Sequence, residues 1–108
     1  MEQLFRKIRQ LIAEKDFETL SQLEIPQPEK FNWVKEVFED IHVEETPGAT
    51  ALLWTDGNET RHYSFAQISA QSNKLLNFLR NKGVMQHDVL LTQMALQPVN
   101  WLAMLATI

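Results

Sequence analysis

The chain has 108 residues, of which 44% are hydrophobic, and a formal net charge of −4 at pH 7. This length gives room for one small domain with a single core. The excess of acidic residues argues against a nucleic-acid-binding surface, because such surfaces gather Lys and Arg on one face. No cysteine is present, which excludes disulfides, thiolate metal sites and cysteine nucleophiles.

Charged residues recur throughout the first 15 positions, so the N-terminus lacks the uninterrupted apolar stretch of a signal peptide. No apolar run reaches the roughly 20 residues that a membrane-spanning helix needs. The sequence therefore predicts a soluble, cytoplasmic protein without a transmembrane segment.

The first thirty residues predict a helical extension. Apolar residues at three- and four-residue spacing predict a helix over about residues 2–15, and Asp16 can cap a short second turn. Pro26 and Pro28 then require an extended linker from Glu24 to Lys30. The apolar residues of the two helical segments are Leu4, Phe5, Ile8, Leu11 and Ile12, followed by Phe17, Leu20 and Leu23.

A further helix is predicted from Trp33 to Glu44, with Asn32 as its N-cap. Its buried stripe would consist of Val34, Val37, Phe38 and Ile41. Two β-favouring runs follow, from Ala49 to Trp54 and from Thr60 to Tyr63, on either side of the turn dipeptide Asp56-Gly57. This arrangement predicts a β-hairpin.

The best-defined predicted element is the helix that begins after Ser64. Ser64 and Gln67 have the spacing of a capping box, and Gly83 offers the left-handed stop that glycine adopts without strain. The apolar face of this helix would consist of Phe65, Ile68, Leu75, Leu76 and Leu79.

Two more elements are predicted near the C-terminus. The run from Val89 to Met94 has the length and composition of a strand, and the residues after Pro98 predict a helix that reaches Ile108 without a closing signal. The fold class is therefore α/β: N-terminal helices, a β-hairpin, then helix, strand and helix. We expect the chain to be an incomplete piece of a larger domain.

In order and spacing, these motifs resemble the N-terminal part of AMP-forming acyl-CoA synthetases, of the acetyl-CoA and medium-chain type. The resemblance covers residues 31–108, whereas residues 1–30 resemble a family-variable extension. The chain departs from the family's pattern at His87, Val89 and Ala95-Leu96. The matching positions are Phe31-Asn32-Trp33, Trp54, Tyr63-Ser64-Phe65, Ser72-Asn73, Gly83-Val84, Asp88 and Pro98.

The resemblance implies a parent enzyme that joins a carboxylic acid to CoA through an acyl-adenylate, with ATP and Mg²⁺. The family's chemistry rests on a phosphate loop and a C-terminal lysine, and neither motif occurs in this sequence. We therefore carry over no catalytic, cofactor-binding or metal-binding residue. The resemblance implies a non-catalytic scaffold whose partner is the rest of the parent chain.

Two other interpretations stay open at this point. The chain could be a free-standing α/β module that binds a partner protein through Val99–Ile108, or the start of a peptide-synthetase adenylation domain. In a piece of a larger domain the apolar side chains of Val99–Ile108 would face the missing part and lack a cover, so we expect the isolated chain to self-associate through this segment.

Individual side chains point to structural roles. His42, His62 and His87 are too far apart for a helical metal pair. Ser64, Ser69 and Ser72 lack the Gly-x-Ser-x-Gly elbow of a nucleophile and are interpreted as capping and polar-face residues. Core packing is the predicted role of a set of aromatic residues. This set is Phe31, Trp33, Phe38, Trp54 and Trp101.

Overall fold

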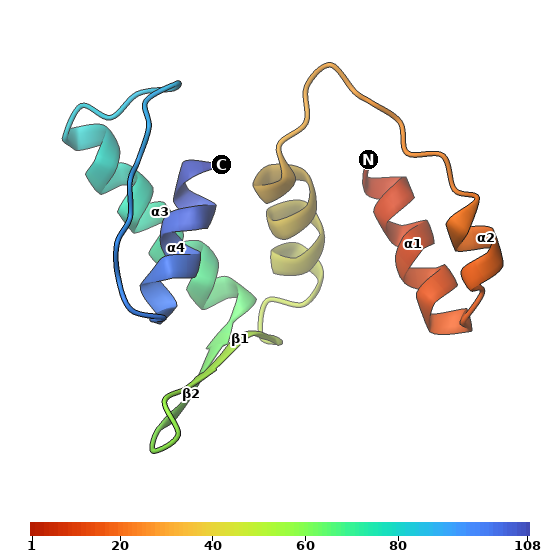
Figure 1. The fold of residues 1–108 in the computed structure, drawn as a ribbon, viewed down its shortest axis with the longest axis horizontal. Coiled ribbons are helices and arrows are strands. Elements are labelled where there is room, and N and C mark those ends of the chain that lie inside the picture. The colour runs from red at the N-terminus through yellow and green to blue at the C-terminus, as the bar shows by residue number, and fades with distance from the viewer.

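The computed structural model describes all 108 residues. Figure 1 shows α1 and α2 side by side at one end of the molecule, α3 and α4 together at the other, and η1 between them. This arrangement confirms the mixed α and β fold class. In chain order the elements are α1 (Glu2–Glu14), α2 (Phe17–Ser21), η1 (Val34–Val43), β1 (Thr50–Thr55), β2 (Thr60–Ser64), α3 (Phe65–Asn81) and α4 (Pro98–Thr107).

The N-terminal helices confirm their predicted boundaries. Lys15 ends α1 in the left-handed region, with φ of 58°. Asp16 caps α2, because its carboxylate accepts hydrogen bonds from the backbone N–H of Thr19 at 3.1 Å and from its hydroxyl at 2.7 Å. α1 also contacts η1, and an ion pair between Arg6 and Glu45 joins the two regions.

The helix predicted after Asn32 is present, but its type differs from the prediction. The Asn32 side chain accepts a hydrogen bond from the backbone N–H of Lys35 at 2.9 Å, which confirms its capping role. Residues Val34–Val43 then form a π-helix rather than an α-helix. Apolar positions three and four apart keep to one side of both helix types, so the periodicity cannot distinguish them.

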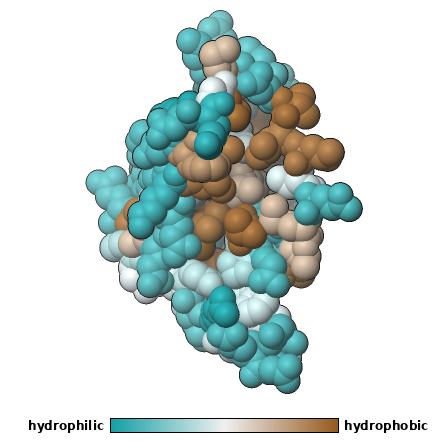
Figure 2. Space-filling view, turned by 90° about the vertical axis from the view of Figure 1, so that its left-hand side faces the viewer, coloured by the Kyte–Doolittle hydropathy of each residue, from teal (hydrophilic) through white to brown (hydrophobic).

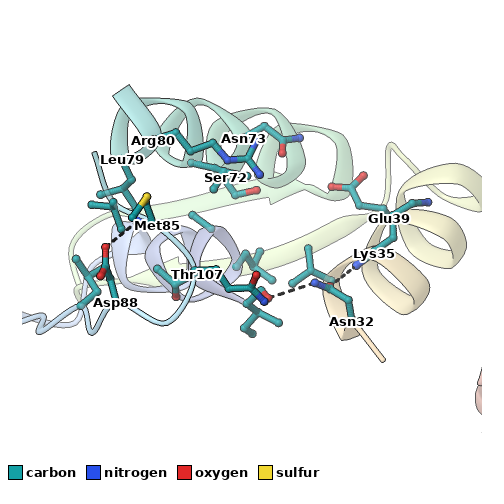
Figure 3. A pocket seen from close by; sticks show the side chains of 18 of the residues that line it. Asn32, Lys35, Glu39, Ser72, Asn73, Leu79, Arg80, Met85, Asp88 and Thr107 are labelled. Carbon is teal, nitrogen blue, oxygen red and sulfur yellow. Dashed lines mark hydrogen bonds between the residues drawn. The ribbon is translucent and has the colours of Figure 1, made fainter. Parts of the chain in front are cut away.

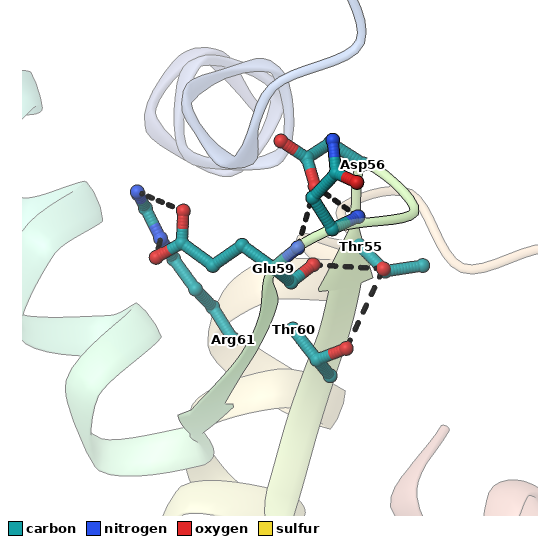
Figure 4. A network of polar contacts seen from close by, with 6 residues as sticks. Thr55, Asp56, Glu59, Thr60 and Arg61 are labelled. Carbon is teal, nitrogen blue, oxygen red and sulfur yellow. Dashed lines mark hydrogen bonds and ion pairs between the residues drawn. The ribbon is translucent and has the colours of Figure 1, made fainter.

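The predicted hairpin is confirmed as an antiparallel pair of β1 and β2, with Leu53 opposite His62. At the turn, the Asp56 carboxylate accepts hydrogen bonds from the backbone N–H groups of Asn58 and Glu59 (Figure 4). Gly57 has a φ of +93°, a value that favours glycine. These backbone donors also lower the pKa of Asp56 below its ordinary value.

The α3 helix confirms both predicted ends. The Ser64 hydroxyl accepts from the Gln67 N–H at 3.2 Å, and the Gln67 side chain accepts from the Ser64 N–H at 2.8 Å, which completes the capping box. At the other end Gly83 has a φ of +88°, as a left-handed stop requires.

Replacing Ser64 by alanine is expected to lower the free energy of unfolding by about 1 kcal/mol, because one N-terminal N–H of α3 loses its acceptor. Chemical denaturation measures the change. Gln71→Ala is the matched control, since Gln71 lies on the same helix and its side chain makes no hydrogen bond. Equal losses in both variants would contradict a specific capping contribution.

The strand predicted from Val89 to Met94 is wrong. This segment has no regular secondary structure, and the only sheet is the two-stranded pair of β1 and β2. The physical reason is the lack of a neighbouring strand, because a strand is stable only when its backbone groups pair with another strand.

The C-terminal helix α4 is confirmed, but its predicted exposure is partly wrong. α4 packs against α3, and its residue Leu105 is only 9% exposed while Trp101 and Leu102 are half-buried. The predicted apolar surface is thus partly covered within the chain. The large apolar side chains of residues 98–108 that stay exposed are Val99, Met104 and Ile108.

The core is small, with 11 of 108 residues buried. Val37 and Ile41 of η1 are fully buried, as the predicted stripe requires. Phe38 of η1, Ile68 of α3 and Leu105 of α4 form one cluster. This cluster joins three elements that are distant in sequence, so it holds the central part of the fold together.

Candidate functional site

A groove with a volume of about 1070 Å³ lies between η1, α3, the loop after Gly83 and α4. Its apolar lining comes from all four of these segments (Figure 3). The apolar lining residues are Val34, Val43, Leu76, Leu79, Val84, Met85, Leu90, Leu105, Ala106 and Ile108.

Polar side chains at one edge of the groove bind other groups of the same chain. Lys35 forms an ion pair with Asp40, and the Asn32 side-chain N–H donates to the backbone carbonyl of Ile108 at 3.2 Å (Figure 3). These contacts tie the start of η1 to the end of α4. They position the groove walls rather than present free donors to a ligand.

A second polar group lies deeper, between η1 and α3. The Ser69 hydroxyl donates to the Glu39 carboxylate at 2.6 Å, and the Ser72 hydroxyl donates to the Ser69 carbonyl at 3.0 Å. No buried side-chain nitrogen or oxygen lacks a hydrogen-bond partner. The network therefore satisfies its own members, which is the arrangement expected of a structural contact.

The predicted role is confirmed for one of the three serine residues and wrong for the other two. Ser64 is a cap, as predicted, but Ser69 and Ser72 are buried at 8% and 4% exposure instead of lying on a polar face. The hydrogen bonds to Glu39 and to the α3 backbone offset the cost of burying these hydroxyls. Because serine is small, this face of α3 can pack closely against neighbouring elements.

The loop after α3 forms the far wall of the groove. The Asp88 carboxylate accepts a hydrogen bond from the Met85 N–H at 2.7 Å, which closes a turn over residues 85–88. His87 lies in this turn with a φ of +74°. His87 is exposed and is one of the residues that line the groove.

The structure does not bring the three histidines together. His42 stacks on Phe65 with ring centroids 4.9 Å apart and an interplanar angle of 9°, whereas His62 lies on β2 and is exposed. No group of three or more His, Cys, Asp or Glu side chains is placed to hold a metal ion.

Burial lowers the pKa of His42 below its ordinary value of 6.5; the positive charge of Arg9 lowers it further, and Glu45 acts in the opposite direction. The unfolded chain therefore binds a proton more readily at this position than the folded chain. The contribution of His42 to the free energy of unfolding is therefore fully present above about pH 6.5, where the side chain is neutral in both states. This contribution is lost as the pH falls toward the lowered pKa of His42 in the folded chain.

We therefore expect the free energy of unfolding to fall more steeply for the native sequence than for His42→Gln as the pH drops from about 7 to about 5. Denaturant melts at a series of pH values measure the slopes. His62→Gln, which removes an exposed histidine, should keep the native slope. If His42→Gln kept the native slope, His42 would not be the source of the pH dependence.

The predicted aromatic core is correct in part. Trp54 is buried, and its indole N–H donates to the backbone carbonyl of Leu96 at 3.0 Å. Phe38 is also buried, but Phe31 and Trp33 are 40% and 37% exposed. The Trp54 to Leu96 contact spans 42 residues, and no local pattern in the sequence signals it.

The glycines lie in three separate turns, before β1, between β1 and β2, and after α3. A phosphate cradle needs several backbone N–H groups that converge on one anion, and these turns do not provide it. The three glycine turns thus do not form a glycine-rich phosphate loop. Separately, no helix combines the length and apolar character needed to span a membrane.

Comparison with known proteins gave no matching family model but several relatives. The chain is 42% identical over 81 residues to 4-hydroxybutyrate–CoA ligase 1 of Metallosphaera sedula, a match that covers 73% of this chain. It is 36% identical over 69 residues, or 62% of its length, to acetyl-coenzyme A synthetases of Shewanella frigidimarina and Methylobacterium radiotolerans. The matches span only 14% of the first ligase and 11% of the two synthetases.

Proposed function

Because this chain is a homologue of the AMP-forming acyl-CoA synthetases, we propose that it forms part of the framework of an enzyme of that family. The observation that carries the proposal is the 42% identity over 81 residues to a CoA ligase. Residues 31–108 would form the N-terminal portion of an AMP-binding domain, and residues 1–30 a helical N-terminal extension.

The proposed parent enzyme is a cytoplasmic ligase that activates a carboxylic acid in two steps. In the first step ATP, with Mg²⁺, and the acid give an acyl-adenylate and pyrophosphate. In the second step CoA takes the acyl group and AMP leaves. The names of the relatives favour CoA as the acceptor, and they make a peptide-synthetase adenylation domain the weaker alternative.

Within such an enzyme we assign this chain a non-catalytic role. Three features support the assignment: the glycines lie in separate turns, no acidic or histidine cluster is placed to hold a metal ion, and several polar side chains at the groove bind other groups of the same chain. No step of the reaction is assigned to a residue of this chain.

A chimera tests the framework role. The matched 81-residue segment of the Metallosphaera ligase is replaced by the corresponding residues of this chain, and ligation of 4-hydroxybutyrate and shorter acids to CoA is measured. A framework segment should preserve the order of acid preference. A folded chimera with a changed preference would show instead that this segment helps to select the acid.

The isolated chain provides the companion measurement, in which pyrophosphate exchange into ATP is followed with a panel of carboxylic acids. We expect no exchange above the background without enzyme. The intact Metallosphaera ligase is the positive control, and exchange by the isolated chain would overturn the non-catalytic assignment.

A free-standing interaction module is the second candidate. The observation that favours it is the exposure of several large apolar side chains between Met85 and Leu96, since apolar surface of this kind marks interaction sites. Inactive but folded chimeras together with a tight, specific complex of the isolated chain would support this candidate.

A further inference from the structure

The segment from Met85 to Leu96 carries the most exposed large apolar side chains of the molecule. Val89 and Leu91 are 95% and 91% exposed, and Met85 and Leu96 are 73% and 72% exposed. Figure 2 views the molecule from the side on which this segment lies in Figure 1 and shows apolar side chains gathered there around a hollow. Exposed apolar surface that gathers in one place marks a contact site.

Within this segment the exposure of the side chains alternates as it does along a β-strand. Val89 and Leu91 are almost fully exposed, whereas Leu90 between them is 43% exposed and lines the groove. Successive side chains of a strand point to opposite faces. Both faces of this run therefore carry large apolar side chains, which is typical of a strand that is buried on both faces.

The backbone of the same run has no partners. No backbone N–H or carbonyl between Val89 and Met94 makes a hydrogen bond to another backbone group or to a side chain. The neighbouring Leu96 is held in place, because its carbonyl accepts a hydrogen bond from the Trp54 indole at 3.0 Å. A row of open donors and acceptors on a tethered segment is a template on which another strand pairs.

The composition of the segment indicates what kind of strand fits it. Strands that stay unpaired are normally protected by charges, prolines or bulges. The residues from Val89 to Ile108 include no charged side chain, and no proline occurs among them before Pro98. A charged partner would lose its hydration at this surface without gaining an ion pair. The partner that fits is thus an uncharged, apolar strand.

The relatives indicate where such a strand comes from. The match spans only 14% of the Metallosphaera ligase, so most of an enzyme of that family lies outside a segment of this size. A strand in the same polypeptide is present at an effective concentration on the order of millimolar. A second copy of this chain at micromolar concentration competes far less well for the same surface.

We propose that residues 89–94 form a β-strand in the parent enzyme, paired with an uncharged, apolar strand from the remainder of the parent chain. Pairing gives the open backbone groups their partners, and the remainder of the chain covers Val89 and Leu91. The proposal rests on the proposed framework role, because only a longer parent chain provides this strand. It also explains why a run with the composition of a strand has no regular structure in the isolated chain.

Hydrogen exchange on the isolated chain and on a chimera tests the pairing. In this chimera residues 1–108 replace the corresponding N-terminal part of the Metallosphaera ligase, and the rest of the ligase follows. At least every second amide of residues 89–94 should exchange on the order of a hundredfold more slowly in the chimera than in the isolated chain, because alternate N–H groups of a strand point to the same neighbour.

Leu91→Lys tests the side-chain contact in the same two proteins. In the isolated chain it should leave the denaturant midpoint nearly unchanged, because Leu91 is 91% exposed. In the chimera it should lower the midpoint and remove the amide protection, since a charge takes the place of a buried leucine. Leu91→Met is the matched control and should keep both, because its side chain stays apolar and similar in volume. An unfolded Leu91→Lys chimera beside a folded Leu91→Met chimera counts as the expected loss.

The outcomes separate this proposal from the framework role. A folded, active chimera in which residues 89–94 exchange as fast as in the isolated chain would overturn the strand pairing and leave the framework role standing. Protection that develops in the isolated chain as its concentration rises would also overturn it, since a second copy would then be the cover. A chimera that does not fold would count against the framework role and, with it, against the strand pairing.

Discussion

Replacing Phe38 by alanine is expected to lower the free energy of unfolding by about 3–5 kcal/mol, the range found for large aromatic residues in cores. Phe38 is 4% exposed and belongs to the cluster with Ile68 and Leu105. Its ring also lies 6.2 Å from that of Trp33 and 5.8 Å from that of Phe65. With so few buried residues elsewhere, the variant should be largely unfolded near room temperature.

Phe78→Ala is the matched control for this prediction, because Phe78 is 56% exposed and the Lys82 ammonium group lies over its ring, 5.6 Å from the ring centroid. An exposed cation–π contact contributes about 0.5–1 kcal/mol. Thermal and denaturant unfolding of both variants give the comparison. Similar losses for Phe38→Ala and Phe78→Ala would mean that the cluster does not hold the fold together.

Local signals in the sequence predicted the ends of the elements well. Asp16, Asn32 and Ser64 each cap the helix assigned to them, and Gly83 adopts the predicted positive φ. These predictions succeed because a cap or a stop depends on residues within one turn of each other. The same holds for the hairpin, whose turn is closed by Asp56 and its immediate neighbours.

Features that depend on distant residues could not be predicted in this way. Residues 89–94 have the composition of a strand, but strand formation requires a partner that the sequence pattern does not reveal. The burial of Ser69 likewise depends on Glu39, thirty residues away. The choice of a π-helix for Val34–Val43 has no signal in the apolar periodicity, and nothing in the structure explains it.

The groove was not predicted for the same reason. Its walls come from η1, α3, the loop after Gly83 and α4, and no single motif links these segments. The sequence also placed the uncovered apolar surface on α4, whereas the structure places most of it on the preceding loop. The packing of α4 against α3 is therefore the feature on which the groove depends.

That packing leads to the second large expected effect, for Leu105→Ala. Leu105 is 9% exposed and lies in the cluster with Phe38 and Ile68, so its truncation should lower the free energy of unfolding by about 2–5 kcal/mol.

Met104→Ala is the control on the same helix turn, because Met104 is 53% exposed and its truncation should cost far less. Denaturant unfolding followed by circular dichroism measures both losses. If the two variants lost equal stability, α4 would not pack on α3 through Leu105, and the groove wall that α4 provides would have to lie elsewhere.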